Sequence, residues 1–188
     1  MTDTIHRTTI RRRRRRGVLA AVAGAALALA AGLGGAVPAQ ADVLDATCTG
    51  TTNIAYSPGI KLVAATVDVT DTTSFSCTTS KASINRGHLS NSSTGVERGC
   101  LSVGATSFNR TVYWSDYSTS DLTGTSTTAN IAGNTVETIT GTVSGGRFED
   151  DTFVLVRTLP NIAGLLDCLT TTGLTQVSGT SVLTITGL

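Results

Sequence analysis

The stretch Thr123–Val143, TGTSTTANIAGNTVETITGTV, decides the expected fold, because it places two threonine-rich runs around a short turn signal. The runs span roughly 123–131 and 135–143, and Ala132-Gly133-Asn134 lies between them. β-Branched residues lose little freedom in an extended backbone and pack well on a pleated surface. Two such runs around a short glycine-containing loop predict a β-hairpin.

Strand signals recur on both sides of this hairpin. Between Leu62 and Val69 apolar residues return at every second position, and Val182–Thr186 has a similar alternation. The apolar run Phe153–Val156 predicts a strand buried on both faces. Ser57-Pro58-Gly59 has proline and glycine where a type II turn favours them, and Gly145-Gly146 predicts a further break.

A helical pattern occurs only near 162–169, where apolar residues are three and four positions apart. Strands that recur about every 8–12 residues with turns between them are typical of a sandwich or a barrel. We expect an all-β domain over residues 42–188, a single antiparallel β-sandwich with one short helix near 162–169. The spacing of Cys100, Trp114 and Cys168 resembles that of immunoglobulin domains and supports a sandwich. If the segment around Trp114 is a strand, Val112 and Trp114 face one side, and Trp114 is the expected core anchor.

All four cysteines of the chain follow residue 41. Four cysteines permit three pairings, and we favour Cys48–Cys77 and Cys100–Cys168. The first would join the strands that flank the 57–59 turn, and the second would tie the helical segment to the middle of the sheet. Zinc is the competing interpretation. It is disfavoured because no two cysteines have ligand spacing and His88 is the only histidine after residue 41.

The first 41 residues predict a cleaved secretory signal peptide. A basic n-region, 1–16, ends in six consecutive arginines, and an uncharged h-region, 17–37, follows it. Pro38-Ala39-Gln40-Ala41 supplies small residues at the −3 and −1 positions, so cleavage is expected after Ala41. The alternative is a membrane anchor, since the apolar stretch is just long enough to cross a bilayer.

The export route stays open between the Sec and the twin-arginine pathways, because Arg15-Arg16-Gly17-Val18-Leu19 fits the loose twin-arginine pattern. Oxidising conditions outside the cell would favour the disulfides. We therefore expect a secreted, extracellular protein.

After Ala41 the chain carries seven Lys and Arg against twelve Asp and Glu, a net charge of −5. A negative domain without a basic cluster is a poor partner for nucleic acid or for an anionic membrane surface. We expect neither as a partner, and we expect no cofactor.

Tyr113 and Tyr117 are the candidate binding residues. If 113–117 is a strand, both tyrosines face the same side, about 7 Å apart. Flat aromatic rings with this spacing could stack on sugar rings. The competing interpretation is ordinary packing of the two rings against a neighbouring strand.

Catalytic and metal-binding candidates are few. A serine hydrolase would have to use His88, with Ser144-Gly145-Gly146 as a remote match to a nucleophile segment, but the chain lacks a Gly-x-Ser-x-Gly elbow. We therefore expect no catalytic residue. The acidic cluster Glu149-Asp150-Asp151 predicts a solvated turn, and a calcium site that uses Asp150 and Asp151 is the weaker alternative.

Several landmarks recur in a known family. They are Cys48-Thr-Gly, Ser57-Pro58-Gly59, Thr111–Asp116 (TVYWSD), Gly141–Phe148 (GTVSGGRF), Cys168–Leu174 (CLTTTGL) and the closing threonine-rich strand. With these the chain resembles a family of uncharacterised small exported proteins of high-GC Gram-positive bacteria. The resemblance implies a disulfide-stabilised β-sandwich and export from the cell, and it assigns no functional residue.

The expected function is that of a secreted, non-catalytic binding module whose partner is a cell-wall polysaccharide or an extracellular protein. The alternative is an extracellular protease inhibitor, for which Arg98-Gly99-Cys100-Leu101 is the candidate loop. An extracellular hydrolase ranks third.

Overall fold

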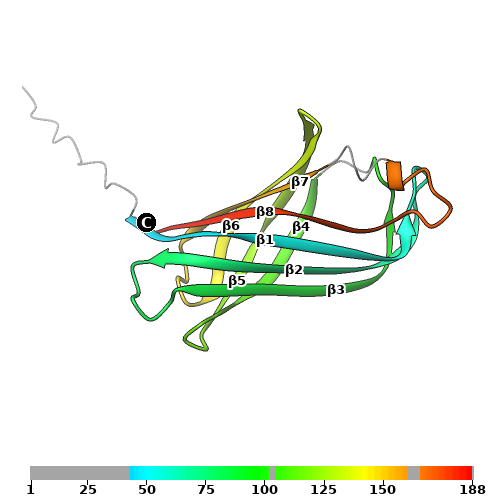
Figure 1. Cartoon of the computed structure of the whole chain (residues 1–188). Coiled ribbons are helices and arrows are strands. Elements are labelled where there is room, and N and C mark those ends of the chain that lie inside the picture. The colour runs from blue at the N-terminus through cyan, green and yellow to red at the C-terminus, as the bar shows by residue number, and fades with distance from the viewer. Residues whose placement is uncertain (1–42, 102–104, 161–165, 188) are drawn as a thin grey trace, which may run out of the picture. The chain divides into compact units, whose positions relative to one another are not determined.

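The computed structural model describes residues 43–101, 105–160 and 166–187. They form eight antiparallel strands, each hydrogen-bonded to the next in sequence, and the last strand returns to pair with the first (Figure 1). The strands are β1 (Val43–Ile60), β2 (Ala65–Thr79), β3 (Arg86–Arg98), β4 (Ala105–Trp114), β5 (Thr119–Ile131), β6 (Asn134–Gly146), β7 (Thr152–Pro160) and β8 (Leu174–Gly187). The sheet is therefore a closed barrel.

The all-β class is confirmed, but the expected immunoglobulin-like β-sandwich is wrong. β1 pairs with β2 along one edge and with β8 along the other, where the register runs from Val43↔Gly187 to Ile60↔Leu174. A sandwich keeps two sheets with free edges, whereas the pairing of the first and last strands joins the two edges of one sheet. Alternating strands suit both architectures, so the outcome depends on this one contact between the two ends of the domain.

The hairpin predicted around Ala132-Gly133-Asn134 is confirmed. Ile131 at the end of β5 faces Asn134 at the start of β6. Ala132 has a φ of 48° and Gly133 a φ of 77°. Two successive residues with positive φ form a type I′ turn, whose twist matches that of the strands it joins.

Two other local predictions, the turn at 57–59 and the burial of 153–156 on both faces, are wrong. Ser57-Pro58-Gly59 lies inside β1, where the pairing with β8 is interrupted between Ala55 and Ile60, and the reversal into β2 comes later. The break predicted at Gly145-Gly146 is confirmed, because β6 ends at Gly146 and β7 begins only at Thr152. The run Phe153–Val156 is buried on one face only, because Val154 is 41% exposed on the outside of the barrel.

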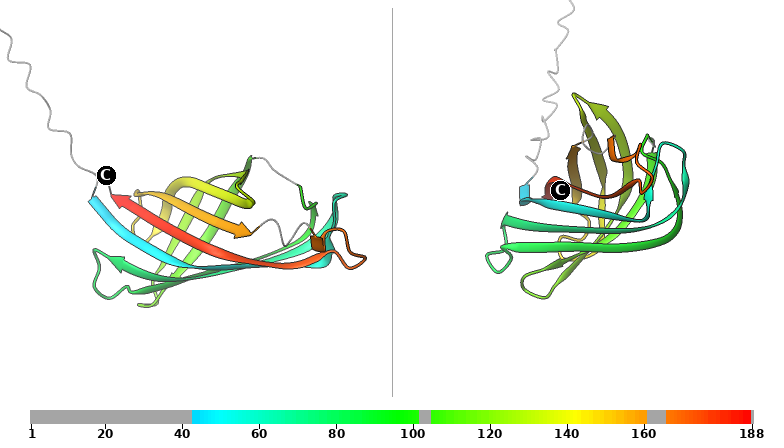
Figure 2. Two further views of the ribbon diagram at one scale, coloured as in Figure 1. Left: turned by 45° about the horizontal axis from the view of Figure 1, so that its top comes forward. Right: turned by 45° about the vertical axis from the view of Figure 1, so that its right-hand side comes forward.

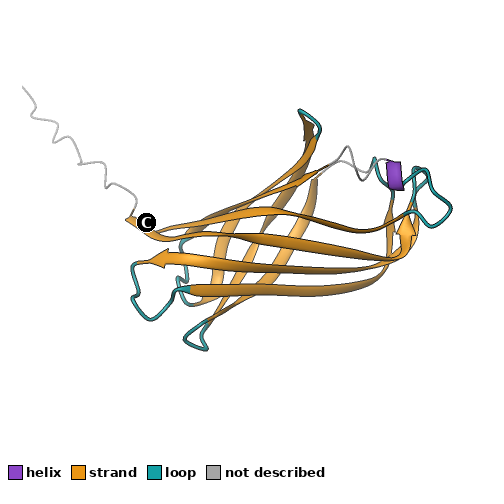
Figure 3. Cartoon of the chain, in the orientation of Figure 1, coloured by secondary structure: helices purple, strands orange, loops and turns teal. Residues whose placement is uncertain are grey.

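Half of the segment predicted as a short helix, 162–169, lies outside the described residues. Its described part forms no helix of useful length, because only Leu166 and Asp167 have helical backbone (Figure 3). The backbone N–H groups of Leu169 and Thr170 donate to the carbonyls of Leu166 and Asp167, three residues back. These are turn hydrogen bonds, and both leucines are exposed.

Two disulfides join the pairs expected from the sequence. Cys48 and Cys77 face each other in the β1–β2 ladder, with their Cα atoms 4.0 Å apart. Cys100, just after β3, is bonded to Cys168, in the segment before β8. The first disulfide therefore lies within the barrel wall, and the second links two connecting segments.

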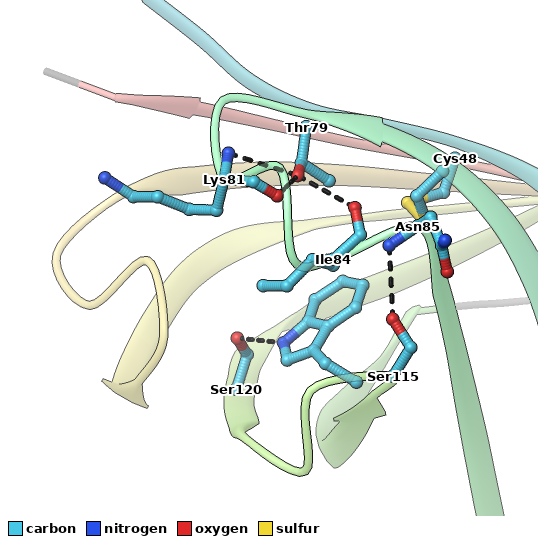
Figure 4. The surroundings of a disulfide bond; sticks show 9 residues. Cys48, Thr79, Lys81, Ile84, Asn85, Ser115 and Ser120 are labelled. Carbon is cyan, nitrogen blue, oxygen red and sulfur yellow. Dashed lines mark hydrogen bonds between the residues drawn. A yellow bond between two sulfur atoms is a disulfide. The ribbon is translucent and has the colours of Figure 1, made fainter.

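Apolar side chains fill one end of the barrel. The residues that point inward here are Phe75, Leu89, Val112, Trp114, Leu122, Ile139, Val143, Phe153, Leu155, Leu183 and Ile185. Trp114, expected as the core anchor, is confirmed as buried, and its indole N–H donates to Ser120 Oγ at 2.8 Å (Figure 4). We call this apolar region the filled end.

Candidate functional site

The inward face of the barrel changes from apolar to polar beyond the filled end. Every strand contributes at least one polar side chain at this level: Thr52, Asp71, Thr73, Asn91, Arg110, Ser126, Glu137, Arg157 and Ser181. We call this set the polar belt. Inward positions recur at every second residue in each strand. The pairing register places Thr52 opposite Thr73 and Asp71 opposite Asn91, and it places Arg157 opposite both Glu137 and Ser181.

A cavity of about 390 Å³ lies on the open side of the polar belt. Six belt residues line it, and Arg98 and Tyr56 add further polar groups. Its apolar lining includes Ile54, Ile60, Val69, Phe108, Leu159 and Val177. A concave, mostly preformed space of this size with a few convergent polar groups is typical of small-molecule sites.

Arg157 is the centre of the belt. Its Nη1 atom lies 2.7 Å from Asp71 Oδ2 and 3.4 Å from Glu137 Oε2, and its Nη2 donates to Thr73 Oγ1 at 3.4 Å. Burial raises the pKa of Asp71, and the adjacent guanidinium offsets part of that rise. Arg157 therefore neutralises two carboxylates that would otherwise be costly to bury.

The hydroxyl groups of the belt extend this network on both sides. Ser126 donates to Glu137 Oε1 at 2.5 Å, and the Thr52 and Thr73 hydroxyls are hydrogen-bonded to each other. Among the described residues, Asp71 Oδ1 and Arg157 Nε are buried without a hydrogen-bond partner. Polar atoms of this kind are rare in native interiors, and they mark the belt as a place where a ligand or ordered water could bind.

Arg110 has no ion pair among the described residues. Its Nη1 donates to the backbone carbonyl of Asn109 at 2.7 Å, and its guanidinium carbon lies 5.4 Å from the centre of the Phe108 ring. Burial lowers the pKa of the Arg110 guanidinium. The Nε atom is also buried without a partner within the described ranges. Arg110 therefore places at the cavity a cation that has no direct ion pair among these residues, although the Asp71 and Glu137 carboxylates favour its charge from a longer distance.

The wall beside Arg110 is incomplete. β3 and β4 pair only from Gly87↔Trp114 to Leu89↔Val112, and beyond this point the two strands diverge (Figure 2). Val96 on one side of this seam and Phe108 on the other both line the cavity. Arg110 comes two residues after Phe108 on β4, so it lies close to the base of the seam.

Tyr56 supplies a measurable marker of cavity burial, since burial raises its pKa to about 12. An unfolded tyrosine ionises near pH 10, so the fold should lose stability as pH rises from about 10 to 12. When tyrosine ionisation is followed by ultraviolet absorbance as pH rises, the native protein should show a late step near pH 12, and Tyr56→Phe should lack that step. If the late step persisted in the variant, this assignment would be wrong.

The candidate residues Tyr113 and Tyr117 do not form the expected pair. β4 ends at Trp114, and Tyr117 lies in the following turn with a φ of 65° and 98% exposure. Tyr113 is on the outside of β4, where its ring stacks on His88 with centroids 5.1 Å apart. The expected strand spacing is therefore wrong, because the Asp116 carboxylate accepts the Ser118 backbone N–H and stabilises a turn.

The catalytic candidates are also not brought together. His88 lies on β3 and Ser144 on β6, two strands that are not neighbours in the barrel, and both side chains are exposed. The Ser144 hydroxyl is hydrogen-bonded to the Thr123 hydroxyl and to the backbone carbonyl of Asp121. In the inhibitor candidate segment, Arg98 ends β3 and lines the cavity together with Gly99 and Cys100.

The acidic cluster lies where a turn was expected, between β6 and β7. Asp150 and Glu149 are exposed, whereas burial, followed by the neighbouring Asp45 carboxylate, raises the pKa of Asp151. Within the residues described, no group of three or more His, Cys, Asp or Glu side chains is placed to hold a metal ion. The solvated turn is confirmed.

Comparison with protein-family models, with curated proteins and with solved structures finds no match to this chain. In the described part of the chain there is no helix with the length and apolarity needed to cross a membrane. The evidence for function therefore comes from the cavity and the polar belt.

The polar belt was missed at the sequence level, although one signal for it was present. In β7 the inward positions are Phe153, Leu155, Arg157 and Leu159, so a charged residue interrupts an apolar alternation. Such an interruption indicates a buried charge that needs a partner. The partner Asp71 is 86 residues away in sequence, and only the barrel register brings it close.

Proposed function

We propose that this protein is a secreted, non-catalytic barrel that binds a small amphipathic molecule in its cavity. The observation that carries the proposal is the polar belt, which provides buried charges and hydrogen-bonding atoms in a cavity whose remaining walls carry both apolar and polar side chains. Secretion is supported by the signal-peptide pattern with cleavage after Ala41 and by the two disulfides. The resemblance to small exported proteins agrees with the same location.

Binding in a barrel also explains why the polar belt is tolerated. A buried ion pair is weak evidence for stability, since apolar residues of similar volume often stabilise a core at least as well. The presence of Asp71, Glu137 and Arg157 at the cavity therefore favours a binding role over a purely structural one. The hydroxyls of Ser126 and Thr128 provide further groups that could orient a ligand.

The test uses N-phenyl-naphthylamine, a neutral apolar fluorophore, with the protein purified after removal of the leader. We expect saturable fluorescence enhancement that Thr128→Trp abolishes, because Thr128 lines the cavity and an indole there would occupy it. Thr127→Trp is the matched control, since Thr127 is the next residue of β5 and is exposed. Equal binding to both variants would place the dye outside the cavity and refute the proposal.

A further inference from the structure

We infer that the ligand is an organic anion, whose negatively charged head group meets Arg110 and whose apolar body lies against the cavity wall. This inference rests on the proposed function and adds the chemical class of the ligand. It starts from the distribution of arginines. Only five arginines follow residue 42, and three of them, Arg98, Arg110 and Arg157, line this one cavity.

The charge balance inside the cavity is positive, although the domain as a whole is negative. Three arginines face two carboxylates there, those of Asp71 and Glu137. Both carboxylates are already engaged by Arg157, which leaves Arg110 and Arg98 without an ion pair among the described residues. Partial burial of a cation that has no direct ion pair costs free energy, and an incoming anion would lower that cost.

Arg110 is better placed than Arg98 to hold the head group. It belongs to the polar belt, whereas Arg98 is the last residue of β3, at the opening of the barrel. Its buried Nε lacks an acceptor, and a guanidinium can give two parallel hydrogen bonds to a carboxylate or sulfonate. The seam between β3 and β4 begins next to it, so the head group has a path to this position.

The apolar part of the ligand follows from the wall. The Phe108 ring lies under the Arg110 guanidinium. Together with Phe108, the apolar part of the cavity wall includes Ile54, Val69, Leu159 and Val177. A fully polar anion such as inorganic phosphate would leave this surface in contact with water. An anion with an aliphatic or aromatic body would bury it at about 25 cal/mol per Å².

A cationic ligand is the opposite possibility, because Asp71 Oδ1 has no hydrogen-bond partner among the described residues. It is disfavoured since the same carboxyl group already holds Arg157 through its other oxygen, at 2.7 Å. A second cation at this carboxyl group would be repelled by Arg157 and Arg110, which both act electrostatically on Asp71. The two possibilities differ in the sign of charge that the cavity selects, and this difference can be measured.

The experiment compares two fluorophores with the same aromatic skeleton, anilinonaphthalene sulfonate and neutral N-phenyl-naphthylamine. We expect the sulfonate to bind at least about tenfold more tightly, as for a hydrogen bond to a charged group. Arg110→Gln should abolish this preference while the neutral dye still binds, and Arg110→Lys should retain part of it. Arg86→Gln is the matched control, because Arg86 is exposed at the far end of β3.

Equal affinity for the two dyes, tighter binding of the neutral dye, or a preference that survives Arg110→Gln would overturn the inference. So would tighter binding of a naphthyl trimethylammonium salt than of the sulfonate. These outcomes differ from failure of the proposed function, in which neither dye responds to Thr128→Trp. Thermal unfolding of each variant verifies that it is folded before affinities are compared.

Discussion

Replacement of Arg157 by methionine is expected to lower the free energy of unfolding by about 3–5 kcal/mol at pH 7. The guanidinium is 3% exposed and lies within 3.4 Å of two carboxylates. Methionine can fill much of the space, so the loss comes from leaving Asp71 and Glu137 buried without their counter-charge. Urea unfolding followed by circular dichroism would measure it.

The pH dependence of this loss distinguishes charge from packing. Burial already raises the pKa of Asp71, and removal of Arg157 should raise it further. A carboxyl group with a raised pKa in the folded state takes up a proton more readily than in the unfolded chain. The variant should therefore regain stability as pH falls from neutral through that pKa. Adding Asp71→Leu should recover part of the loss at pH 7 as well.

The matched control for Arg157 is Arg147→Met. Arg147 also forms an ion pair, with Asp116 at 2.9 Å, but its side chain is 38% exposed. Exposed pairs contribute about 0–1 kcal/mol, so this variant should be close to the native protein. Equal losses in the two variants, or a loss in Arg157→Met that does not change with pH, would contradict the assigned role of the buried charge network.

Replacement of Trp114 by alanine is expected to cost about 3–5 kcal/mol, the range for deletion of a buried large aromatic side chain. Trp114 is 4% exposed and packs edge-on against Phe148, with ring centroids 5.8 Å apart. Its indole also lies over Gly87, where even a Cβ atom would come within 2.7 Å of the ring. The substitution would leave a large void at the filled end of the barrel. Urea unfolding at pH 7 would measure this loss as well.

Tyr113→Ala is the control for Trp114, because the two residues are adjacent in β4 and point to opposite faces of the wall. Tyr113 is 46% exposed and contacts His88 on the outside. We expect a loss of about 1 kcal/mol or less, within the range of surface substitutions and cross-strand pairs. A loss as large as that of Trp114→Ala would show that the outer face, and not the filled end, dominates stability.

Local features of the fold could be predicted where neighbouring residues determine the conformation. The hairpin at Ala132-Gly133 was predictable because a two-residue turn needs positive φ, which glycine adopts freely. Trp114 could be predicted as buried because a large apolar side chain in an alternating strand faces the core. Tyr117 was misplaced because its turn depends on the Asp116 carboxylate, a local signal that competed with a strand-like aromatic run.

The all-β class follows from the threonine-rich alternation of the chain, and the polar positions of each strand indicate which side faces outward. The pairing of β8 with β1, which closes the sheet into a barrel around a cavity, became apparent only in three dimensions. The same holds for the polar belt, where Asp71, Glu137 and Arg157 meet from three strands. The physical reason is that side-chain alternation is a property of neighbouring residues, whereas closure and register depend on contacts between segments far apart in the chain.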